Sequence, residues 1–331
     1  MTAGALEAPL LRTEGLTRHF RLGGLLSRRM LHAVDDVDLE IRQREVVALV
    51  GESGSGKSTV ARLLARLYRP TRGRILFHGE PVDRLRSRAA SLGYHGQVAM
   101  VFQDPYSSLN PAFRVSHGVT RALRLHRPEL SPDERQHEAE RLFTIVGLTP
   151  AAATLRRFPY ELSGGQRQRV GFAEALASKP SLILADEPVS MLDVSIRAGI
   201  LNLMTELRDR EGVSMLFITH DIASARYVAD RIVVMYGGHV VESGPSEAVV
   251  AHPRHPYAQL LMASVPDPRT PPADLVGGAV GDPPKVIDPI EGCRFVGRCP
   301  VAIEICSRVT PRLRELGPGH SAACHVAVAD S

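Results

Sequence analysis

Short apolar runs alternate with helical patterns along much of the chain and predict a sheet flanked by helices. Residues 44–50 (REVVALV) have the character of a buried strand, as do residues 181–188, 214–220 and 231–236. Continuous apolar strands of this kind are typical of a parallel sheet covered on both faces. Because helical stretches such as residues 197–212 lie between them, the pattern predicts an α/β core.

Two other regions differ from this core. Residues 10–20 and 34–41 predict strands, the second with alternating apolar and polar positions, before the first buried strand begins. From about residue 104 to residue 170 the strand signal fades and helical patterning replaces it. We therefore expect a strand-rich start and a helical subdomain in the middle of the chain.

Local signals set the ends of individual elements. Ser131 followed by Pro132 and Glu134 forms a capping box at a helix start, and Gly147 marks the end of that helix. Residues 236–239 predict a hairpin turn between two apolar strands.

The C-terminal part has a different composition. Nine prolines fall between residues 253 and 289, which indicates an extended connector rather than a core element. All four cysteines follow it, between Cys293 and Cys324. We expect three parts: a main domain over residues 10–250 with a helical subdomain at about 104–170, a connector over 251–290, and a cysteine extension over 291–331.

Charge and hydropathy narrow the class of protein. The net charge is +4 and the basic residues are scattered, which argues against a nucleic-acid partner. No apolar run approaches the roughly 18 residues of a membrane span, and the N-terminus lacks the features of an export signal. We expect a cytosolic protein that reaches a membrane only by docking on other subunits.

The strongest motif is GESGSGKS, residues 51–58, which fits the phosphate-binding loop G-x-x-x-x-G-K-[ST] at every position. Its glycines let backbone N–H groups surround phosphate oxygens, and the following helix directs its positive end toward them. Lys57 is expected to contact the β- and γ-phosphates and Ser58 to ligate Mg²⁺. A glycine turn that arose by chance is a poor explanation for a match at every position of the motif, between a strand and a helix.

Two further strand ends carry polar groups suited to nucleotide hydrolysis. Asp186 and Glu187 end one apolar strand, where we expect Asp186 to hold Mg²⁺ and Glu187 to activate the attacking water. Such carboxylates are otherwise solvated turn residues. His220 ends another strand, where it faces the ligand crevice of a doubly wound sheet and is expected to contact the γ-phosphate.

Taken in order, the phosphate loop, QDPYSSLNP, LSGGQRQRV, LADEP, SMLD and THD resemble the ATP-binding cassette (ABC) family over about residues 10–250. FQDPYSSLNP, HPYAQLL and the cysteine tail look like the ATPase subunit of oligopeptide/dipeptide importers. The resemblance implies an α/β P-loop NTPase fold: a RecA-like core with an antiparallel β subdomain and an α-helical subdomain, plus a small C-terminal cysteine extension.

The resemblance also implies residue roles. Gln103 matches the glutamine that contacts Mg²⁺ and water, Asp193 the aspartate that follows the catalytic strand, and Phe20 an aromatic that stacks on adenine. Glu187, His220 and Gln103 are then the catalytic residues. The implied Mg²⁺ site is Ser58, Gln103 and Asp186, and the implied ATP contacts are Phe20, Gly51, Glu52, Ser53, Gly54, Ser55, Gly56, Lys57, Ser58, Thr59, Ser163, Gly164, Gly165, Gln166 and Asp193.

Ser163, Gly164 and Gly165 form a second phosphate-binding turn at the start of a helix. In this family one ATP lies between the phosphate loop of one subunit and this turn of another, so the second turn predicts a dimer. Some positions depart from the family pattern. Val189 and Met191 are expected to be conservative packing changes, whereas Glu174 reverses the charge of a frequent arginine and puts any salt bridge there in doubt.

The cysteine tail predicts a metal centre, because disulfides are rare among cytosolic proteins. Cys293, Cys299, Cys306 and Cys324 are spaced more widely than the close pairs of structural zinc sites. We rank a [4Fe–4S] cluster first, free thiols second and zinc third. His320 and His325 are not expected to be ligands.

The resemblance implies an ATPase that drives peptide import from the cytoplasmic face of the inner membrane. Its partners are then a second, sister ATPase subunit, two permease subunits and, through these, a solute-binding protein. Two alternatives remain: a soluble ABC ATPase of DNA repair or translation, and a redox-sensing or metal-binding module on a cassette scaffold. The transported solute stays open.

Overall fold

The computed structural model of the chain describes residues 8–23, 27–85, 87–104, 109–263 and 286–328. These residues fall into two compact units. The first unit comprises Met1–Arg42, Val46–Val82 and Ile218–Ser331, and the second comprises Gln43–Glu45 and Asp83–Phe217.

The first unit contains an antiparallel sheet with the strand order β2-β1-β4-β5. Thr13 ties the two longest strands together, because its Oγ1 donates to the Val37 carbonyl at 2.9 Å and accepts from the Leu39 N–H at 2.8 Å. Both long strands are confirmed, although the second begins four residues before the predicted residue 34. The strands are β1 (Leu11–Arg21), β2 (Met30–Ile41), β4 (Arg72–Phe77) and β5 (Glu80–Pro81).

A second group of strands in the first unit follows the order β11-β12-β10-β9-β3. β3 and β9 are parallel, whereas β9 and β10 form the predicted hairpin, with Gly237 and Gly238 at φ 54° and 85° as such a tight turn requires. The strands are β3 (Val46–Val50), β9 (Arg231–Tyr236), β10 (His239–Pro245), β11 (Arg314–Gly317) and β12 (His320–Ala322).

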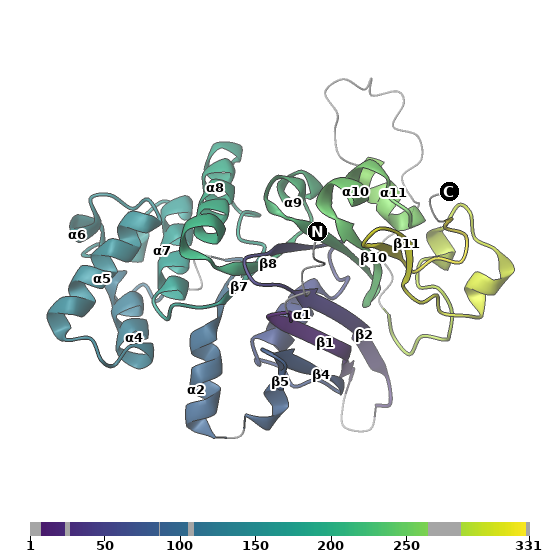
Figure 1. Ribbon diagram of the computed structural model, residues 1–331, viewed down its shortest axis with the longest axis horizontal. Helices are drawn as coiled ribbons and strands as arrows, with labels where there is room; N and C mark the ends of the chain where they lie inside the picture. The colour runs from purple at the N-terminus through teal and green to yellow at the C-terminus, as the bar shows by residue number, and fades with distance from the viewer. Residues whose placement is uncertain (1–7, 24–26, 86, 105–108, 264–285, 329–331) are drawn as a thin grey trace, which may run out of the picture. The chain divides into compact units, whose positions relative to one another are not determined.

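The C-terminal extension continues this sheet. β12 pairs antiparallel with β10, and β11 pairs with β12, so strands that lie between Cys306 and Cys324 run beside the hairpin (Figure 1). The helices and 3₁₀ turns of the first unit and its boundary are α1 (Lys57–Leu64), η1 (Val82–Arg84), α9 (Ile222–Val228), α10 (Ser246–Ala251), α11 (Pro256–Ala263), η4 (Val296–Arg298) and η5 (Glu304–Ser307).

The second unit is built on buried strands with helices around them. β6 (Val98–Val101) and β7 (Leu182–Asp186) are parallel, and β8 (Ser214–Thr219), most of which belongs to this unit, follows β7 in the sheet. Every residue of β7 and β8 is buried, as their continuous apolar sequences predict. The helices are α2 (Arg88–Gln97), α4 (Ser116–His126), α5 (Pro132–Ile145), α6 (Ala151–Thr154), η2 (Pro159–Glu161), α7 (Gly164–Leu176) and α8 (Val194–Glu211).

Helices α4, α5 and α7 pack against one another in the second unit (Figure 1). The capping box predicted for α5 is confirmed: Ser131 accepts from the Glu134 N–H at 3.3 Å, and Glu134 accepts from the Ser131 N–H at 2.8 Å. Gly147 follows the helix at φ 72°, as a helix end requires. The helical character predicted for residues 104–170 is therefore confirmed, apart from residues 105–108, which lie outside the described residues.

The connector prediction for residues 251–290 was partly wrong. Residues 256–263 form helix α11, and its Tyr257 is completely buried against Tyr236 and Phe295. The prolines misled the prediction because Pro256 occupies the first position of the helix, where proline is tolerated. Residues 264–285 lie outside the described residues. None of the helices found in the described ranges is long and apolar enough to cross a membrane.

Candidate functional site

The phosphate loop connects β3 to α1 in the first unit. Gly51 and Gly56 have φ values of 152° and 106°. A Cβ on Gly51 would lie 2.2 Å from the Met235 carbonyl oxygen, and one on Gly56 would lie 2.1 Å from that of Ala33. Only glycine fits at either position, because a backbone oxygen cannot move aside as a flexible side chain could.

Lys57 directs its ammonium back into this loop. The Nζ atom donates to the carbonyl oxygens of Gly51 at 2.7 Å and of Glu52 at 2.8 Å, and the side chain is buried. Ser55 is also buried, whereas Ser53 and Gly54 are exposed at the tip of the loop. The loop therefore surrounds a fixed positive charge with backbone groups, and α1 begins directly behind it with Ser58 and Thr59 in its first turn.

Phe20 lies at the end of β1, in the same unit. Its ring contacts the edge of Tyr68 at 5.4 Å between centroids, and the Arg18 guanidinium lies 4.6 Å from the centroid of the Phe20 ring. A base that stacks on Phe20 therefore has to share the ring with Arg18 or displace it. Adenine stacking on Phe20 remains a prediction.

His220 is exposed between β8 and α9. The residues on both sides fix its backbone: Thr219 Oγ1 accepts from the Asp221 N–H at 3.0 Å, and Asp221 caps α9 by accepting from the Ala223 N–H at 3.0 Å. The imidazole is thus presented from a rigid strand-to-helix turn.

In the second unit, Gln103 and the carboxylate pair come together. Asp186 is buried at the end of β7, and Glu187 follows it with a left-handed φ of 45°. Gln103 Nε2 donates to Glu187 Oε2 at 3.1 Å, which joins two residues that are 84 positions apart. A left-handed backbone at a residue other than glycine is uncommon and is concentrated at functional sites.

The turn that is predicted to bind a second phosphate lies at the start of α7. Ser163 is the N-cap and forms a capping box with Gln166, so both side chains hold the helix start in place. A Cβ on Gly165 would lie 2.3 Å from Ile196 Cγ2, which explains why this turn requires glycine. The N–H groups of Gly164 and Gly165 are in the first turn, where helices have no internal acceptors for them.

The segment from Val189 to Asp193 leads into helix α8. Asp193 caps α8, accepting from the Ile196 N–H at 3.0 Å. Val189 is buried, as expected for a conservative packing change, but Met191 is 58% exposed. The packing interpretation of Met191 was therefore wrong, because within this chain its side chain points outward.

Comparison with known proteins identifies the family of this chain. Residues 34–190 match the ABC transporter family, and residues 241–306 match the C-terminal region of oligopeptide/dipeptide transporters. A probable peptide ABC transporter ATP-binding protein of Sinorhizobium fredii is 43% identical over 320 residues, which cover 96% of this chain and 90% of that protein. The chain belongs to the ABC transporter ATP-binding proteins.

Other relatives extend this likeness. A putative oligopeptide transport ATP-binding protein of Bacillus subtilis is 40% identical over 96% of this chain and 95% of its own length. Among solved structures, a dimeric ATP-binding cassette in a post-hydrolysis state with ADP and Pi is 29% identical, with a TM-score of 0.64 over 71% of this chain and 98% of that one. The protein is therefore an ABC ATPase in family and in fold.

The cysteines of this ABC ATPase gather in the first unit and are all unpaired. Burial raises the pKa of Cys293, and the nearby thiols of Cys306, Cys299 and Cys324 raise it further. In the part of the chain that the structure describes, no three of these sulfur atoms lie within 4.8 Å of one another. Four sulfurs around one zinc ion would lie about 3.8 Å apart, so their spacing does not fit a closed zinc site.

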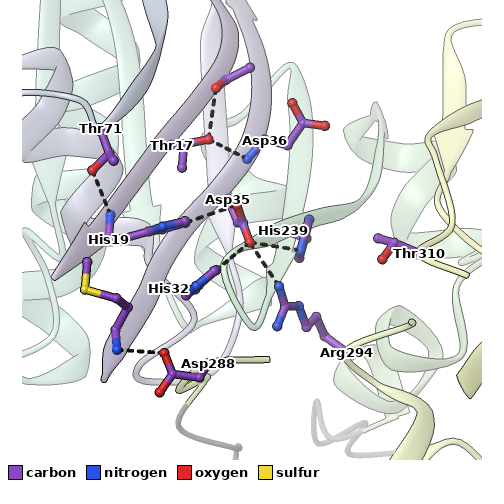
Figure 2. Close-up of polar contacts among 12 residues, drawn as sticks. Thr17, His19, His32, Asp35, Asp36, Thr71, His239, Asp288, Arg294 and Thr310 are labelled. Carbon is purple, nitrogen blue, oxygen red and sulfur yellow. Dashed lines mark hydrogen bonds and ion pairs between the residues drawn. The ribbon is translucent and has the colours of Figure 1, made fainter. Parts of the chain in front are cut away.

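An ionic cluster that the sequence did not predict surrounds Asp35 of β2 (Figure 2). The carboxylate accepts from His32 Nδ1 at 2.9 Å, His19 Nε2 at 3.2 Å and Arg294 Nη2 at 2.9 Å. Burial by itself would raise the pKa of Asp35, but the hydrogen bonds of His32 and then His19 outweigh it and lower the pKa. His19, His32 and Asp35 are close enough to share a metal ion, yet Arg294 already places a positive charge on this carboxylate.

Glu174 lies on α7 beside a cavity of about 280 Å³ in the second unit. Burial raises the pKa of its carboxyl to about 7, and no cationic partner for it is found among the described residues. With this pKa the Glu174 carboxyl is partly protonated near neutral pH. It therefore carries less than one full negative charge there. His95, Phe102 and His126 line the same cavity.

Proposed function

We propose that this ABC ATPase is the nucleotide-binding subunit that energises a membrane importer of peptides, either dipeptides, oligopeptides or a related solute. The observation that carries the proposal is the combination, in one chain, of a complete hydrolytic set with a C-terminal region that matches oligopeptide/dipeptide transporters. Relatives that cover nearly the whole chain bear the names of peptide import proteins. A soluble ABC ATPase of DNA repair or translation would have no use for that C-terminal region.

The proposed ATP site uses the residues that the sequence motifs predict. Lys57 and the backbone of the phosphate loop bind the β- and γ-phosphates, while Ser58, Gln103 and Asp186 hold Mg²⁺ directly or through water. The Gln103 amide that donates to Glu187 supports their shared role, since it fixes the orientation of the proposed general base. The proposed contacts also include Phe20, Gly51–Gly56, Thr59 and His220.

We propose that the turn formed by Ser163, Gly164 and Gly165 binds the γ-phosphate of an ATP held by a sister subunit. The capping box fixes the start of α7, and the first-turn N–H groups of Gly164 and Gly165 have no acceptor within the helix, which supports this role. Asp193, at the start of the neighbouring helix, and Gln166 complete this surface. The assembly then contains a second ATPase subunit, two permeases on whose cytoplasmic face the pair docks, and a solute-binding protein reached through them.

The proposed domains follow the sequence expectation: an ATPase domain over residues 10–250, with a helical subdomain at about 104–170, and a cysteine extension over 291–331. The strands β11 and β12 attach the extension to the sheet of the first unit, which supports treating it as an integral part of the ATPase.

We also propose that Cys293, Cys299, Cys306 and Cys324 hold a [4Fe–4S] cluster. The proposal is supported by four unpaired thiols in one segment, no three of which lie within 4.8 Å of one another in the part of the chain that the structure describes. A bound cluster would crosslink the extension, because its ligands come from both ends of this segment. Burial raises the pKa of Cys293 and Cys299, so binding has to expel their protons.

The function is tested by purifying the protein with its genomic neighbours and measuring peptide-stimulated ATP hydrolysis and uptake in vesicles. Glu187→Gln should bind ATP but lose hydrolysis and uptake. Gly164→Asp should bind ATP at its own phosphate loop yet fail to close the dimer. Uptake that persists in Glu187→Gln would refute energy coupling. For the thiols, anaerobic purification should give iron and absorbance near 400 nm, and a colourless, iron-free, folded protein would refute the cluster.

A further inference from the structure

The segment between Cys293 and Cys299 brings an arginine to the phosphate loop. Arg298 Nη1 donates to Glu52 Oε2 at 2.8 Å, and Arg298 Nη2 donates to Glu52 Oε1 at 3.1 Å. The two side chains are only 11% and 24% exposed. Two parallel bonds between a guanidinium and a carboxylate fix distance and angle together, so this contact is geometrically specific.

Glu52 is the second residue of the phosphate loop and is held at two further points. Its N–H donates to the Tyr257 hydroxyl at 2.8 Å, and its carbonyl accepts from Lys57 Nζ at 2.8 Å. With the two Arg298 bonds, backbone and side chain of Glu52 are fixed at once. A shift in the backbone of Glu52 therefore also shifts the Lys57 ammonium, because the Glu52 carbonyl oxygen is one of the acceptors that position it.

An aromatic platform holds Arg298 in place. Its Nη1 lies 3.3 Å from the Tyr236 hydroxyl, and its guanidinium lies 5.9 Å from the ring centroid of Phe295. Tyr236, Tyr257 and Phe295 are almost completely buried and contact one another with ring centroids 4.5 to 5.5 Å apart. The arginine is thus not a mobile surface side chain, since packed rings on the hairpin, α11 and the extension limit its position.

A second arginine of the same segment bonds to strand β2 of the first unit. Arg294, which directly follows Cys293, donates to Asp35 Oδ2 at 2.9 Å (Figure 2). Both arginines lie next to cysteines and both bond to carboxylates of the ATPase domain. The extension is therefore attached by ionic contacts at two places, of which one is the phosphate loop.

We propose that Arg298 is a positioning residue for ATP binding, which fixes the phosphate loop through Glu52 and so lets the C-terminal extension set the affinity for ATP. The inference rests on the proposed binding of ATP phosphates by residues 51–59. Arg298 does not touch the nucleotide. It acts by keeping Glu52, and with it Lys57, in the geometry that receives the phosphates.

The test measures ATP binding and steady-state hydrolysis by the purified full-length protein. Arg298→Gln removes the charge and the bidentate contact, and we expect the dissociation constant and the KM for ATP to rise about 5- to 20-fold. We expect kcat to change less than about twofold, because Arg298 acts through Glu52 on nucleotide binding and is not one of the proposed catalytic residues. The control is Arg308→Gln, since Arg308 lies in the same extension and pairs with Glu304 at 2.6 Å on the surface.

A double-mutant cycle separates positioning from general destabilisation. If Arg298 acts through Glu52, Glu52→Gln should weaken ATP binding by a similar factor, and the double variant should be no worse than either single one. The charge-exchanged pair Glu52→Arg with Arg298→Glu should recover part of the affinity. Arg298→Lys keeps the charge and provides a milder variant should Arg298→Gln fold poorly.

Equal ATP affinity in Arg298→Gln and Arg308→Gln would overturn the inference, and so would additive losses in the double variant. Lys57→Ala distinguishes this failure from failure of the proposed site. If Lys57→Ala binds ATP like the unchanged protein, the proposed phosphate site is wrong. If Lys57→Ala loses binding while Arg298→Gln keeps it, only the role of Arg298 is wrong.

Discussion

Glu174 provides the sharpest test of the electrostatics in the second unit. Its carboxyl is held on α7 against Gly118 of α4, beside a cavity that also contains His95 and His126. Burial raises its pKa from an ordinary value of 4.5 to about 7. Ionisation of Glu174 is therefore more costly in the folded protein than in the unfolded chain.

The sign of the pH effect follows from this direction. Below pH 4.5 the carboxyl is neutral in both states and costs nothing. As the pH rises from 4.5 to 7 the unfolded chain ionises first, so stability falls, and above pH 7 the loss is complete. The shift corresponds to at most about 3 kcal/mol, since the side chain is not completely buried.

Glu174→Gln replaces the carboxyl with a neutral group of nearly the same shape. We expect the variant to match the unchanged protein near pH 4.5 and to exceed it in thermal stability at pH 8 by about 4 to 10 °C. The assay is a thermal melt of both proteins across this pH range without nucleotide. The control is Glu206→Gln, which makes the same carboxyl-to-amide change at a side chain that is 51% exposed, so we expect only a small change in thermal stability.

A difference between Glu174→Gln and the unchanged protein that is constant from pH 5 to pH 8 would refute the reasoning. So would a variant that is less stable at pH 8. The first result would show that the carboxyl ionises normally in the folded state. The second would show that the ionised form has a stabilising partner.

Three further substitutions test packing and capping. Gly118→Ala should destabilise the second unit by about 1–3 kcal/mol in urea unfolding, because a Cβ there would lie 1.7 Å from Glu174 Oε1. Adding Glu174→Ala should recover part of the lost stability. Equal stability of Gly118→Ala and the unchanged protein would contradict the close contact. Ser131→Ala should cost about 1 kcal/mol through loss of the α5 cap, and a melt that does not move would argue against the capping box. Phe295→Ala should cost about 3–5 kcal/mol and expose the extension to limited proteolysis, since the ring is 1% exposed; an unchanged cleavage pattern would mean that this ring does not hold the extension.

The sequence by itself was sufficient for elements whose signals are local. The capping box at Ser131 and Glu134 depends on two residues three positions apart, and the turn at Gly237 and Gly238 depends on their freedom to adopt positive φ. The glycine spacing of residues 51–58 likewise specified the phosphate loop, because each glycine is needed for the local backbone path. Such features depend on a few neighbouring residues and can therefore be predicted from the sequence.

Tertiary structure decided what depends on residues far apart in the chain. No pattern in the sequence indicates that Arg298 bonds to Glu52, 246 positions away, or that Arg294 completes the cluster around Asp35. The number of prolines led to the wrong prediction of a connector for residues 256–263, which form a helix. Tyr257 is buried there against the ring of Tyr236, which is distant in the sequence and adjacent only in the folded protein. The sequence determined which chemical groups this ATPase carries, whereas the pairing of charges and the pKa of Glu174 required the fold, since burial and distance set both.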